Sequence, residues 1–320
     1  MISLNEAAEF LKKSDHILIL CHVFPDGDTL GSAAALCRGL QQTGRHAAVR
    51  CSDKIGPKYR YLFEGVAPET FEPEAVVAVD IADVSLFGEP LRALYGDRVD
   101  LCLDHHPSNS CYAKRCFVDP KAAATCEIIF RLLRLMEIPV DRQIAACLYT
   151  GITTDTGCFK YTNVTPFTYR IAADLVETGM DAPTINRKMF DTKSRAHVEM
   201  ECRVWDTMEY FYSDRVAVIV ITQRMIRETG AREDDLDGIS ALPRQVEGVL
   251  IGVTLREKPA GGYKISLRAQ KPVNASEICA KFGGGGHAGA AGCTLAVSLE
   301  EAKEQILAGI GAYLNKHAAT

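Results

Sequence analysis

The sequence predicts an α/β fold, with an N-terminal, mostly parallel sheet flanked by helices and a smaller α/β domain towards the C-terminus. Short apolar runs at residues 17–21, 75–79 and 99–103 are typical of strands buried on both faces of a parallel sheet. Segments with helical spacing of apolar residues separate these runs, and such alternation indicates a mostly parallel sheet. The 320 residues suffice for two ordinary domains, each with its own core.

The N-terminal part of the chain alternates strands and helices. Strands are predicted at residues 17–21, 47–51, 75–79 and 99–103, and helices at residues 4–13, 29–42, 88–95 and 122–136, from residue 141 onward and from Thr165-Pro166 onward. In the helix at 29–42, small residues such as Gly31 and Ser32 are expected to permit close approach to the sheet.

A long helix at residues 194–208 is expected to connect the two domains. The predicted division is therefore an N-terminal domain at residues 1–192, a connecting segment at 193–209 and a C-terminal domain at 210–320. In the last of these, strands are predicted at residues 215–221, 249–255, 263–267 and 293–297, and a helix with a capping box at 298–314.

Composition limits the class of protein. Hydrophobic residues at 47% and charged residues at 24% are ordinary globular values. No apolar run approaches the ~18 residues of a membrane span, and the N-terminus lacks an export pattern. The 12 scattered cysteines fit a reducing compartment, so we expect a soluble, cytoplasmic protein without a membrane partner. The net charge of −5 argues against binding long nucleic acids, which usually requires a basic face.

A first cluster of candidate ligands, His22, Asp26 and Asp28, follows the strand at residues 17–21. Three ligating groups in one loop can surround a cation without a regular helix to hold them. Taken alone, the same loop is equally typical of a helix N-cap with an unrelated histidine beside it. A position at the carboxyl end of a parallel strand favours ligand binding, because ligands bind at that edge of open α/β sheets.

A second cluster, Asp104-His105-His106, ends the strand at 99–103. A carboxylate beside two consecutive histidines at a strand end is rarely a core feature, which favours metal binding. Asp80 ends the strand at 75–79, and Asp155 lies in a Thr-Asp-Thr-Gly segment. Each of these two aspartates taken alone is more typical of a turn or an N-cap.

Together, four aspartates and two or three histidines form a set too large for one tetrahedral zinc. The set suits two octahedral divalent cations, Mn²⁺ or Mg²⁺. The four carboxylates balance the charge of two such ions, and two-metal sites of this kind catalyse in-line phosphoryl displacement. The sequence therefore predicts hydrolysis of a phosphate ester.

A glycine-rich run, Gly283 to Gly286 followed by His287, is a second candidate site. Successive glycines let backbone N–H groups approach an anion, and His287 adds a donor. The alternative for such a run is a flexible linker. Arg268 directly continues the alternating strand predicted at 263–267 and is expected to reach the same place. A lone arginine is, however, more often a solvated surface charge.

The motifs resemble those of the DHH phosphoesterase family, named for the triplet at residues 104–106. The match comprises His22-Val23-Phe24-Pro25-Asp26-Gly27-Asp28, Val79-Asp80-Ile81-Ala82-Asp83, Asp104-His105-His106, Gly151-Ile152-Thr153-Thr154-Asp155-Thr156-Gly157 and Gly284-Gly285-Gly286-His287-Ala288-Gly289. The two-domain layout is most similar to the bacterial nano-RNase group, oligoribonucleases that also dephosphorylate 3′-phosphoadenosine 5′-phosphate.

This resemblance implies a role for each matched residue. One Mn²⁺ is expected on His22, Asp26 and Asp80, and the other on Asp28, Asp80, His105 and Asp155. The implied catalytic residue is His106, oriented by Asp104, and the implied substrate-binding residues are Arg268, Gly284, Gly285, Gly286 and His287. The active site is expected in the cleft between the domains. Ala269 stands where the family often has Ser, which leaves the ligand motifs intact.

The resemblance implies an Mn²⁺-dependent, exoribonuclease-type hydrolase. Its expected partners are short RNA or DNA oligonucleotides and the nucleotide bisphosphate, with a homodimer as one possible assembly. Alternatives within enzymes are a phosphodiesterase for linear or cyclic dinucleotides and, with less support, an inorganic pyrophosphatase. From a different class, a non-catalytic nucleotide-binding module requires a lost ligand, and none of the expected ligands is missing from the sequence.

Overall fold

The computed structural model describes residues 1–317. The chain divides into two compact units, the first of residues 1–192 and the second beginning at Lys193. Each unit is built around its own sheet, and the fold class predicted from the sequence is confirmed. Among the described residues, no helix combines the length and apolar character needed to cross a membrane.

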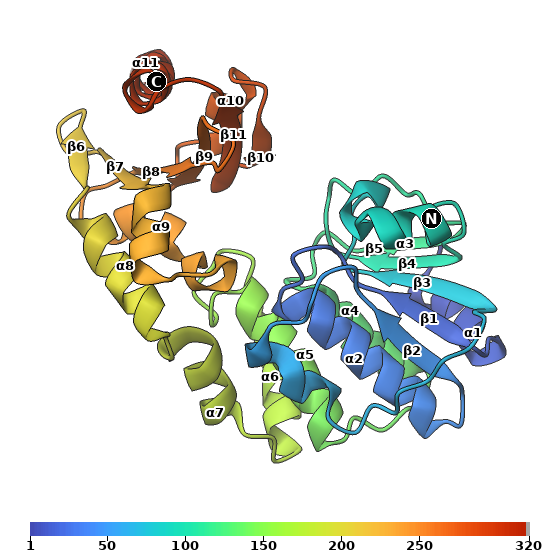
Figure 1. Ribbon diagram of the computed structural model, residues 1–320. Coiled ribbons are helices and arrows are strands. Elements are labelled where there is room, and N and C mark those ends of the chain that lie inside the picture. Colours follow the sequence, from blue (N-terminus) through green and yellow to red (C-terminus); the bar gives the residue numbers. More distant parts are fainter. Residues whose placement is uncertain (318–320) are drawn as a thin grey trace. The chain divides into compact units, whose positions relative to one another are not determined.

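The first unit holds a five-stranded sheet in the order β2-β1-β3-β4-β5, with all neighbouring strands parallel (Figure 1). Its strands are β1 Ile17–Leu20, β2 Ala47–Arg50, β3 Ala75–Val79, β4 Leu101–Asp104 and β5 Cys116–Val118. Its helices are α1 Leu4–Lys13, α2 Gly27–Gln42, η1 Pro57–Phe63, η2 Val84–Phe87, α3 Glu89–Tyr95, α4 Thr125–Leu135, α5 Arg142–Asp155, α6 Pro166–Glu177, α7 Ala182–Asn186 and η3 Arg187–Asp191.

Both faces of this sheet are covered, which explains why its strands are apolar without alternation. Ile17 and Ile19 of β1 pack in a large cluster with residues of α1, α2, α4 and α5. Leu18 and Leu20 point to the opposite face and pack in a smaller cluster with Phe87. Successive side chains of a strand face opposite sides, so one short apolar run serves both cores.

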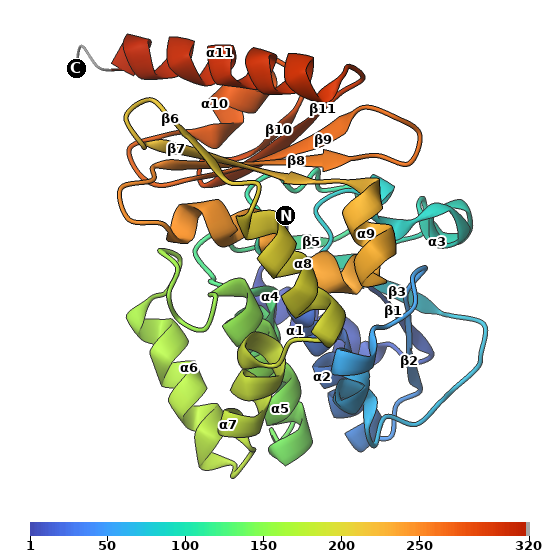
Figure 2. The same ribbon diagram turned by 60° about the vertical axis from the view of Figure 1, so that its left-hand side comes forward.

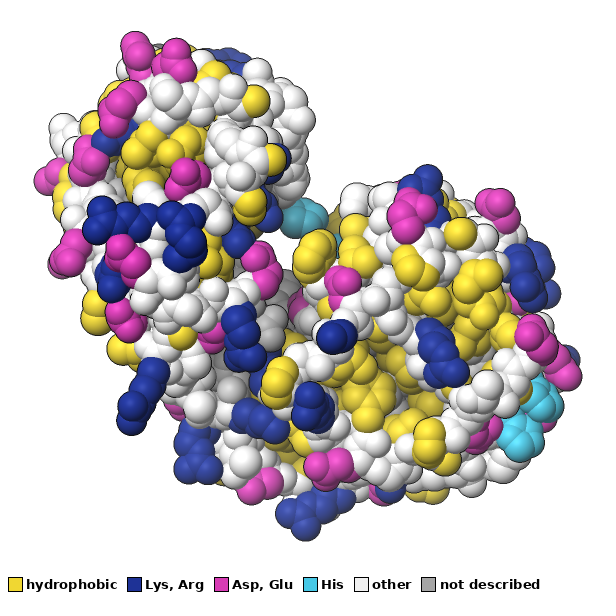
Figure 3. All heavy atoms as spheres, in the orientation of Figure 1, with side chains coloured by type: hydrophobic (Ala, Val, Ile, Leu, Met, Phe, Trp, Pro, Cys, Tyr) yellow, Lys and Arg dark blue, Asp and Glu magenta, His cyan; other side chains and the backbone are white. Residues whose placement is uncertain are grey.

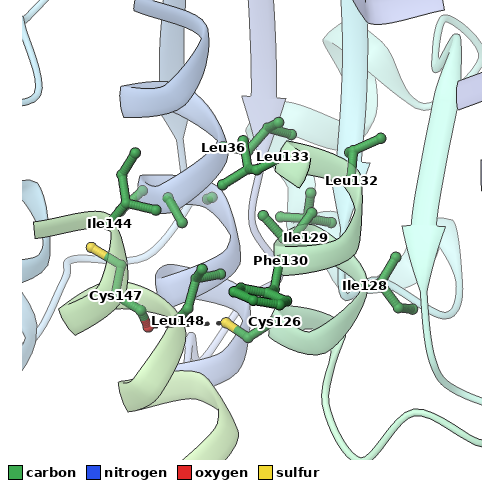
Figure 4. Packing of buried hydrophobic residues seen from close by; sticks show 14 of the residues in the cluster. Leu36, Cys126, Ile128, Ile129, Phe130, Leu132, Leu133, Ile144, Cys147 and Leu148 are labelled. Carbon is green, nitrogen blue, oxygen red and sulfur yellow. Dashed lines mark hydrogen bonds between the residues drawn. The ribbon is translucent and has the colours of Figure 1, made fainter. Parts of the chain in front are cut away.

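Helices α2, α4 and α5 pack against one another as well as against the sheet (Figure 4). Their contact is close at Gly31, where a Cβ would collide with the backbone carbonyl of Cys147 in α5. From the sequence, Gly31 is expected to permit close approach of the helix to the sheet. This expectation is wrong, because the close contact of Gly31 is with the neighbouring helix α5.

The second unit holds a six-stranded sheet in the order β10-β11-β9-β8-β7-β6, in which only β7 and β8 pair in parallel (Figure 2). Its strands are β6 Glu209–Phe211, β7 Val216–Ile221, β8 Ile251–Glu257, β9 Tyr263–Ala269, β10 Gly285–His287 and β11 Ala290–Leu295. Its helices are α8 Arg195–Trp205, α9 Gln223–Thr229, η4 Glu233–Leu236, η5 Ile239–Gln245, α10 Ala275–Ala280 and α11 Leu299–His317.

Two apolar clusters cover the two faces of the second sheet. One contains Ile278 of α10 and Ile306 of α11, and the other contains Met200 and Val204 of α8. A connecting helix is expected at residues 193–209. The helix found there, α8, packs its apolar side against the sheet of the second unit and so forms part of that unit.

Several element bounds differ from the predicted ones, and two differences affect the candidate site. The helix predicted at 122–136 begins at Thr125, and the helix predicted at 29–42 begins two residues earlier, at Gly27. The strand β5 was not predicted, because three residues give too little pattern. Part of the glycine-rich run forms the short edge strand β10.

Candidate metal centre

The carboxyl ends of β1, β3 and β4 bring the two predicted clusters together with the end of α5. Three groups of side chains place their ligand atoms within 4.8 Å of one another: His22, Asp26 and Asp80; Asp28, His105 and Asp155; and Asp80, His105 and His106. All six residues expected to bind metal therefore lie in one neighbourhood, and Asp80 belongs to two of the groups.

His22 is oriented by the backbone next to it. Its Nδ1 lies 2.7 Å from the carbonyl oxygen of Val23, so this nitrogen donates its proton there. The other nitrogen, Nε2, lies 3.7 Å from Oδ1 of Asp26 and 3.7 Å from Oδ2 of Asp80, and in the neutral ring it carries the lone pair that a cation would take up. A hydrogen bond from one ring nitrogen to a carbonyl is the usual way in which a metal-binding histidine is held.

His105 has the same arrangement. Its Nδ1 lies 3.2 Å from the carbonyl oxygen of Ala122, while Nε2 lies 3.2 Å from Oδ2 of Asp155, 3.7 Å from Oδ1 of Asp80 and 4.0 Å from Oδ2 of Asp28. Within the described part of the chain, this buried Nε2 has no hydrogen-bond partner.

These distances test whether a cation fits. Two ligands of one octahedral ion with bonds near 2.1 Å lie about 3 Å apart in cis and about 4.2 Å apart in trans. The separations of 3.2 to 4.0 Å around Nε2 of His105 fall in this range. Among residues 1–317, Nε2 of His105 has no hydrogen-bond partner, although it is buried and faces three carboxylates. A divalent cation bound between these groups explains the arrangement better than hydrogen bonds among the side chains do.

Thr125, at the first turn of α4, supports two of the aspartates. Its backbone N–H donates to Oδ2 of Asp28 at 2.6 Å, and its hydroxyl donates to Oδ1 of Asp80 at 2.9 Å. The N–H of Cys126 donates to Oδ1 of Asp28 at 2.9 Å. The N-cap residue of α4 is Ala124, which has no capping side chain, so Asp28 satisfies these orphan donors from a distant part of the chain.

Thr125 was missed in the sequence because nothing in its own segment marks it as functional. The available signal was indirect: three alanines precede a strongly amphipathic helix where a capping residue is expected.

Asp80 itself has a positive φ of 60°, which is unfavourable for a residue with a side chain. Strain of this kind is typical of functional sites.

The pKa values of Asp28 and of the two candidate histidine ligands are all raised by their surroundings. Burial, together with the charges of Asp80 and Asp155, raises the pKa of Asp28 well above its ordinary value. Burial also disfavours the charged histidines, yet interaction with Asp26 and Asp80 raises the pKa of His22 to about 11. For His105, interaction with Asp155 and Asp28 outweighs burial and raises the pKa to about 10. The site therefore strongly favours positive charge among its carboxylates.

Asp104 fixes the ring of His106. Its Oδ1 lies 2.7 Å from Nδ1 of His106 and accepts a hydrogen bond from the backbone N–H of His105 at 2.8 Å, while Oδ2 accepts one from Asn109 at 2.6 Å. Burial opposes protonation of His106, but the hydrogen bond to Asp104 prevails and raises its pKa. Asn109, also missed in the sequence, holds the carboxylate of Asp104 in place.

Two details of the geometry differ from a regular strand followed by a loop. His105 and His106 do not point to opposite faces as adjacent strand residues would, and their rings meet with centroids 4.5 Å apart, because the strand ends at Asp104. Asp26 and Asp28 were expected in a loop, yet Asp26 is the N-cap of α2 and Asp28 lies in its first turn. The N-cap and ligand interpretations of Asp26 are thus compatible.

In the second unit, His287 and Arg268 lie in one row of the sheet. The register pairs His287 of β10 with Ala290 of β11, and Ala290 with Arg268 of β9. Residues directly opposite each other share a face, and two strand spacings separate these two by roughly 10 Å. The N–H of Gly284 donates to the carbonyl of Cys279 at 3.0 Å, so it is already used within the unit. Gly285 and Gly286 lie on the exposed edge strand.

Comparison with known families identifies both units. The DHH family, N-terminal domain, matches residues 16–152, and the DHHA1 domain matches residues 214–316. Two solved structures share the fold: an exopolyphosphatase-related protein from Bacteroides fragilis, with a TM-score of 0.88 and 23% identity over 97% of this chain and 96% of that one, and RecJ from Thermus thermophilus in complex with Mn²⁺, with a TM-score of 0.58 and 15% identity over 98% and 55%.

Curated relatives give closer sequence likeness. A bifunctional oligoribonuclease and PAP phosphatase of Thermus thermophilus is 32% identical over 95% of this chain and 92% of its own length. A cyclic-di-AMP phosphodiesterase of Listeria monocytogenes is 24% identical, and the alignment covers 95% of this chain but 49% of that protein. With both domain models matched in order and this likeness along almost the full length of the Thermus protein, the chain belongs to the DHH family.

Proposed function

We propose that this protein is a two-metal phosphohydrolase that cleaves short oligonucleotides to mononucleotides and dephosphorylates 3′-phosphoadenosine 5′-phosphate to AMP. The observation that carries the proposal is the position of Asp80, whose Oδ2 faces His22 and whose Oδ1 faces His105, each at 3.7 Å. A carboxylate with one oxygen towards each of two histidine-containing groups suits a bridging ligand. The names of the relatives, led by the Thermus protein, supply the substrates.

In this proposal, His22, Asp26 and Asp80 hold one divalent cation, while Asp28, Asp80, His105 and Asp155 hold the other. Mn²⁺ is the proposed ion and Mg²⁺ the alternative, since an oxygen-rich ligand set with one histidine per ion suits both. Bound at such a site, paired divalent ions supply Lewis acidity and an activated water for phosphoryl displacement.

His106 is the proposed proton carrier. Its hydrogen bond to Asp104 stabilises the protonated ring and raises the pKa of His106 above its ordinary value. A protonated imidazole beside the metal ligands can hydrogen-bond to a phosphoryl oxygen and pass a proton to the leaving oxygen. Asp104 keeps the ring in position and stabilises its charge.

The second unit is proposed to bind the remainder of the substrate. Arg268 and His287 share one face of the sheet, and exposed glycines lie beside His287 on β10. Such a face suits a phosphate or a sugar of a short substrate. That the substrate is held between the two domains stays a prediction, as do the cytoplasmic location and the homodimer.

A second candidate activity is hydrolysis of linear or cyclic dinucleotides. The likeness to the Listeria cyclic-di-AMP phosphodiesterase along 95% of this chain favours it. Cleavage of an oligonucleotide and cleavage of a dinucleotide both break a phosphodiester, so these two activities differ in how the substrate is recognised, whereas removal of the 3′-phosphate from the bisphosphate breaks a phosphomonoester.

One assay separates these functions. Purified protein with Mn²⁺ is incubated with a labelled oligonucleotide series from dinucleotide to 20-mer, with 3′-phosphoadenosine 5′-phosphate, with cyclic di-AMP and with pyrophosphate. The proposal expects the dinucleotide and the bisphosphate to be hydrolysed fastest. Preference for the cyclic dinucleotide, or hydrolysis of the dinucleotide without turnover of longer oligonucleotides or the bisphosphate, would favour the second candidate. Absence of turnover on every substrate would refute both.

A further inference from the structure

The amino-terminal edge of the first sheet carries a second cluster of potential ligands, at the opposite ends of the strands from the candidate metal centre. The register of β1 with β2 and β3 places His46, His16 and Glu74, each the residue before its strand, in one row. Backbone hydrogen bonds fix this row: the N–H of Ile17 donates to the carbonyl of His46 at 2.9 Å, and the N–H of Glu74 to that of His16 at 3.1 Å.

His16 lies between two carboxylates. Its Nδ1 is 3.5 Å from Oδ2 of Asp15 and 3.5 Å from Oε1 of Glu74. This nitrogen is buried and, within residues 1–317, has no hydrogen-bond partner, which is also the state of Nε2 of His105. His16 has a positive φ of 47°, which is an unfavourable conformation for a residue with a side chain.

His46 completes the cluster. Its ring stacks on that of His16, with centroids 4.8 Å apart, and its Nδ1 lies 2.9 Å from Oε2 of Glu69. Asp15 is held by the N–H of His46, which donates to Oδ1 at 2.7 Å. One ligand atom each from Asp15, His16 and His46 lies within 4.8 Å of the others. Figure 3 shows histidine side chains beside acidic ones at the surface of the first unit.

We propose that Asp15, His16 and His46 form a second cation site, with Glu74 as an additional carboxylate and Glu69 orienting His46. Two imidazoles with a carboxylate favour Zn²⁺ and similar transition-metal ions over Mg²⁺ and Mn²⁺, which prefer oxygen. The row spans the starts of β2, β1 and β3, so a bound ion ties three strands together and stabilises the first unit. This role is independent of hydrolysis at the other edge of the sheet.

The test compares zinc binding by the full chain and by a variant, His16→Asn/His46→Gln. Asn is chosen for position 16 because it tolerates a positive φ. Protein saturated with Mn²⁺ is dialysed against micromolar Zn²⁺, and bound metal is measured by elemental analysis. His197→Gln is the matched control, because it removes one imidazole outside the cluster. Unfolding temperature is recorded with and without Zn²⁺.

The proposal expects the wild type and His197→Gln to retain one more Zn²⁺ per chain than the double variant, and to unfold at a higher temperature when Zn²⁺ is present. Equal zinc contents in all three proteins would overturn it, as would a wild type that retains none. If the double variant fails to fold, His46→Gln alone removes one ligand from an exposed position and decides the matter. Hydrolysis by the Mn²⁺-loaded protein is expected to be unchanged in these variants.

Discussion

At the scale of single residues, the candidate metal centre depends on side chains that are held before any ion binds. The two histidines each use one ring nitrogen on a backbone carbonyl, which leaves the other nitrogen facing carboxylates. Asp28 and Asp80 are both anchored by Thr125. The ligands are therefore preorganised, and the cation needs to order few groups when it binds.

Asp80→Asn is expected to reduce the rate of hydrolysis by more than about 100-fold and to lower the metal content of both cation positions. A residue that only orients metal ligands typically costs about 10- to 100-fold. A neutral amide cannot bridge two cations. Asp83→Asn is the control, because Asp83 caps the neighbouring η2 helix and contacts Ser110 without facing the cluster. An inactive, folded Asp80→Asn variant that still binds two Mn²⁺ per chain would contradict the bridging role.

Substitutions of the two adjacent histidines are expected to separate metal binding from turnover. His105→Gln should lose metal, because the unpartnered Nε2 faces three aspartates. His106→Gln should retain metal and lose most of kcat, because its ring is held by Asp104. Elemental analysis and steady-state kinetics of both variants check this assignment, and the reverse pattern would refute it.

Thr125→Val is expected to weaken Mn²⁺ binding about 10- to 100-fold with little loss of stability. Valine keeps the volume and the backbone donor to Asp28 but removes the hydroxyl that holds Asp80. Thr153→Val serves as the control, since among residues 1–317 the hydroxyl of Thr153 bonds only to carbonyls of its own helix. Mn²⁺ titrations of the two variants should differ, and equal affinities would exclude a positioning role for Thr125.

At the scale of elements, the site is held by helix starts as much as by strand ends. Asp26 caps α2, Asp28 satisfies the N-terminus of α4, and Asp141 caps α5, which ends on Asp155. Asp141 also pairs with Arg38 of α2 at 2.8 Å. The relative position of α2 and α5, and with it that of Asp28 and Asp155, therefore depends in part on this ion pair.

Asp141→Asn is expected to lower the free energy of unfolding at pH 7 by about 0.5–1 kcal/mol, because asparagine still caps the helix but cannot pair with Arg38. Burial opposes the charged form of Asp141, but Arg38 and the N–H of Ile144 outweigh it and lower its pKa below 3.8. A lowered pKa means that the stabilisation is present above pH 3.8 and is lost as the pH falls through the folded-state pKa.

Urea denaturation of the wild type and of Asp141→Asn at several pH values checks this expectation. The difference between the two proteins should be constant from pH 7 to about pH 5 and should shrink below pH 4. A difference that persists unchanged at low pH would show that the ion pair does not contribute as described.

At the scale of the whole molecule, charge and size determine which substrates suit the chain. The net charge is −5, and basic and acidic side chains are interspersed on the face shown in Figure 3. Affinity for long nucleic acids grows with the number of phosphates that basic groups neutralise. An acidic chain of this kind gains little from each added nucleotide, which favours short substrates.

Turnover per enzyme is therefore expected to fall as oligonucleotides lengthen from a dinucleotide to a 20-mer. Arg268→Ala should mainly raise KM on dinucleotides, because it removes binding and leaves the proposed metal ligands intact. Lys258→Ala is a suitable control, since Lys258 lies after β8 and outside the row of His287 and Arg268. Equal rates on the dinucleotide and the 20-mer, or an unchanged KM in Arg268→Ala, would contradict this account of substrate selection.

The apolar runs and the residues that end them are enough to predict that the candidate ligands meet at one edge of a parallel sheet. His22, Asp80 and Asp104 each follow or end an apolar run, and the carboxyl ends of parallel strands lie at the same edge. The contacts that hold these side chains in place depend on tertiary packing. Thr125 reaches Asp28 and Asp80 because α4 starts beside them, and no local pattern encodes that contact. Likewise His16, His46 and Glu74 precede different strands, so they form a row only once the order β2-β1-β3 is set by packing.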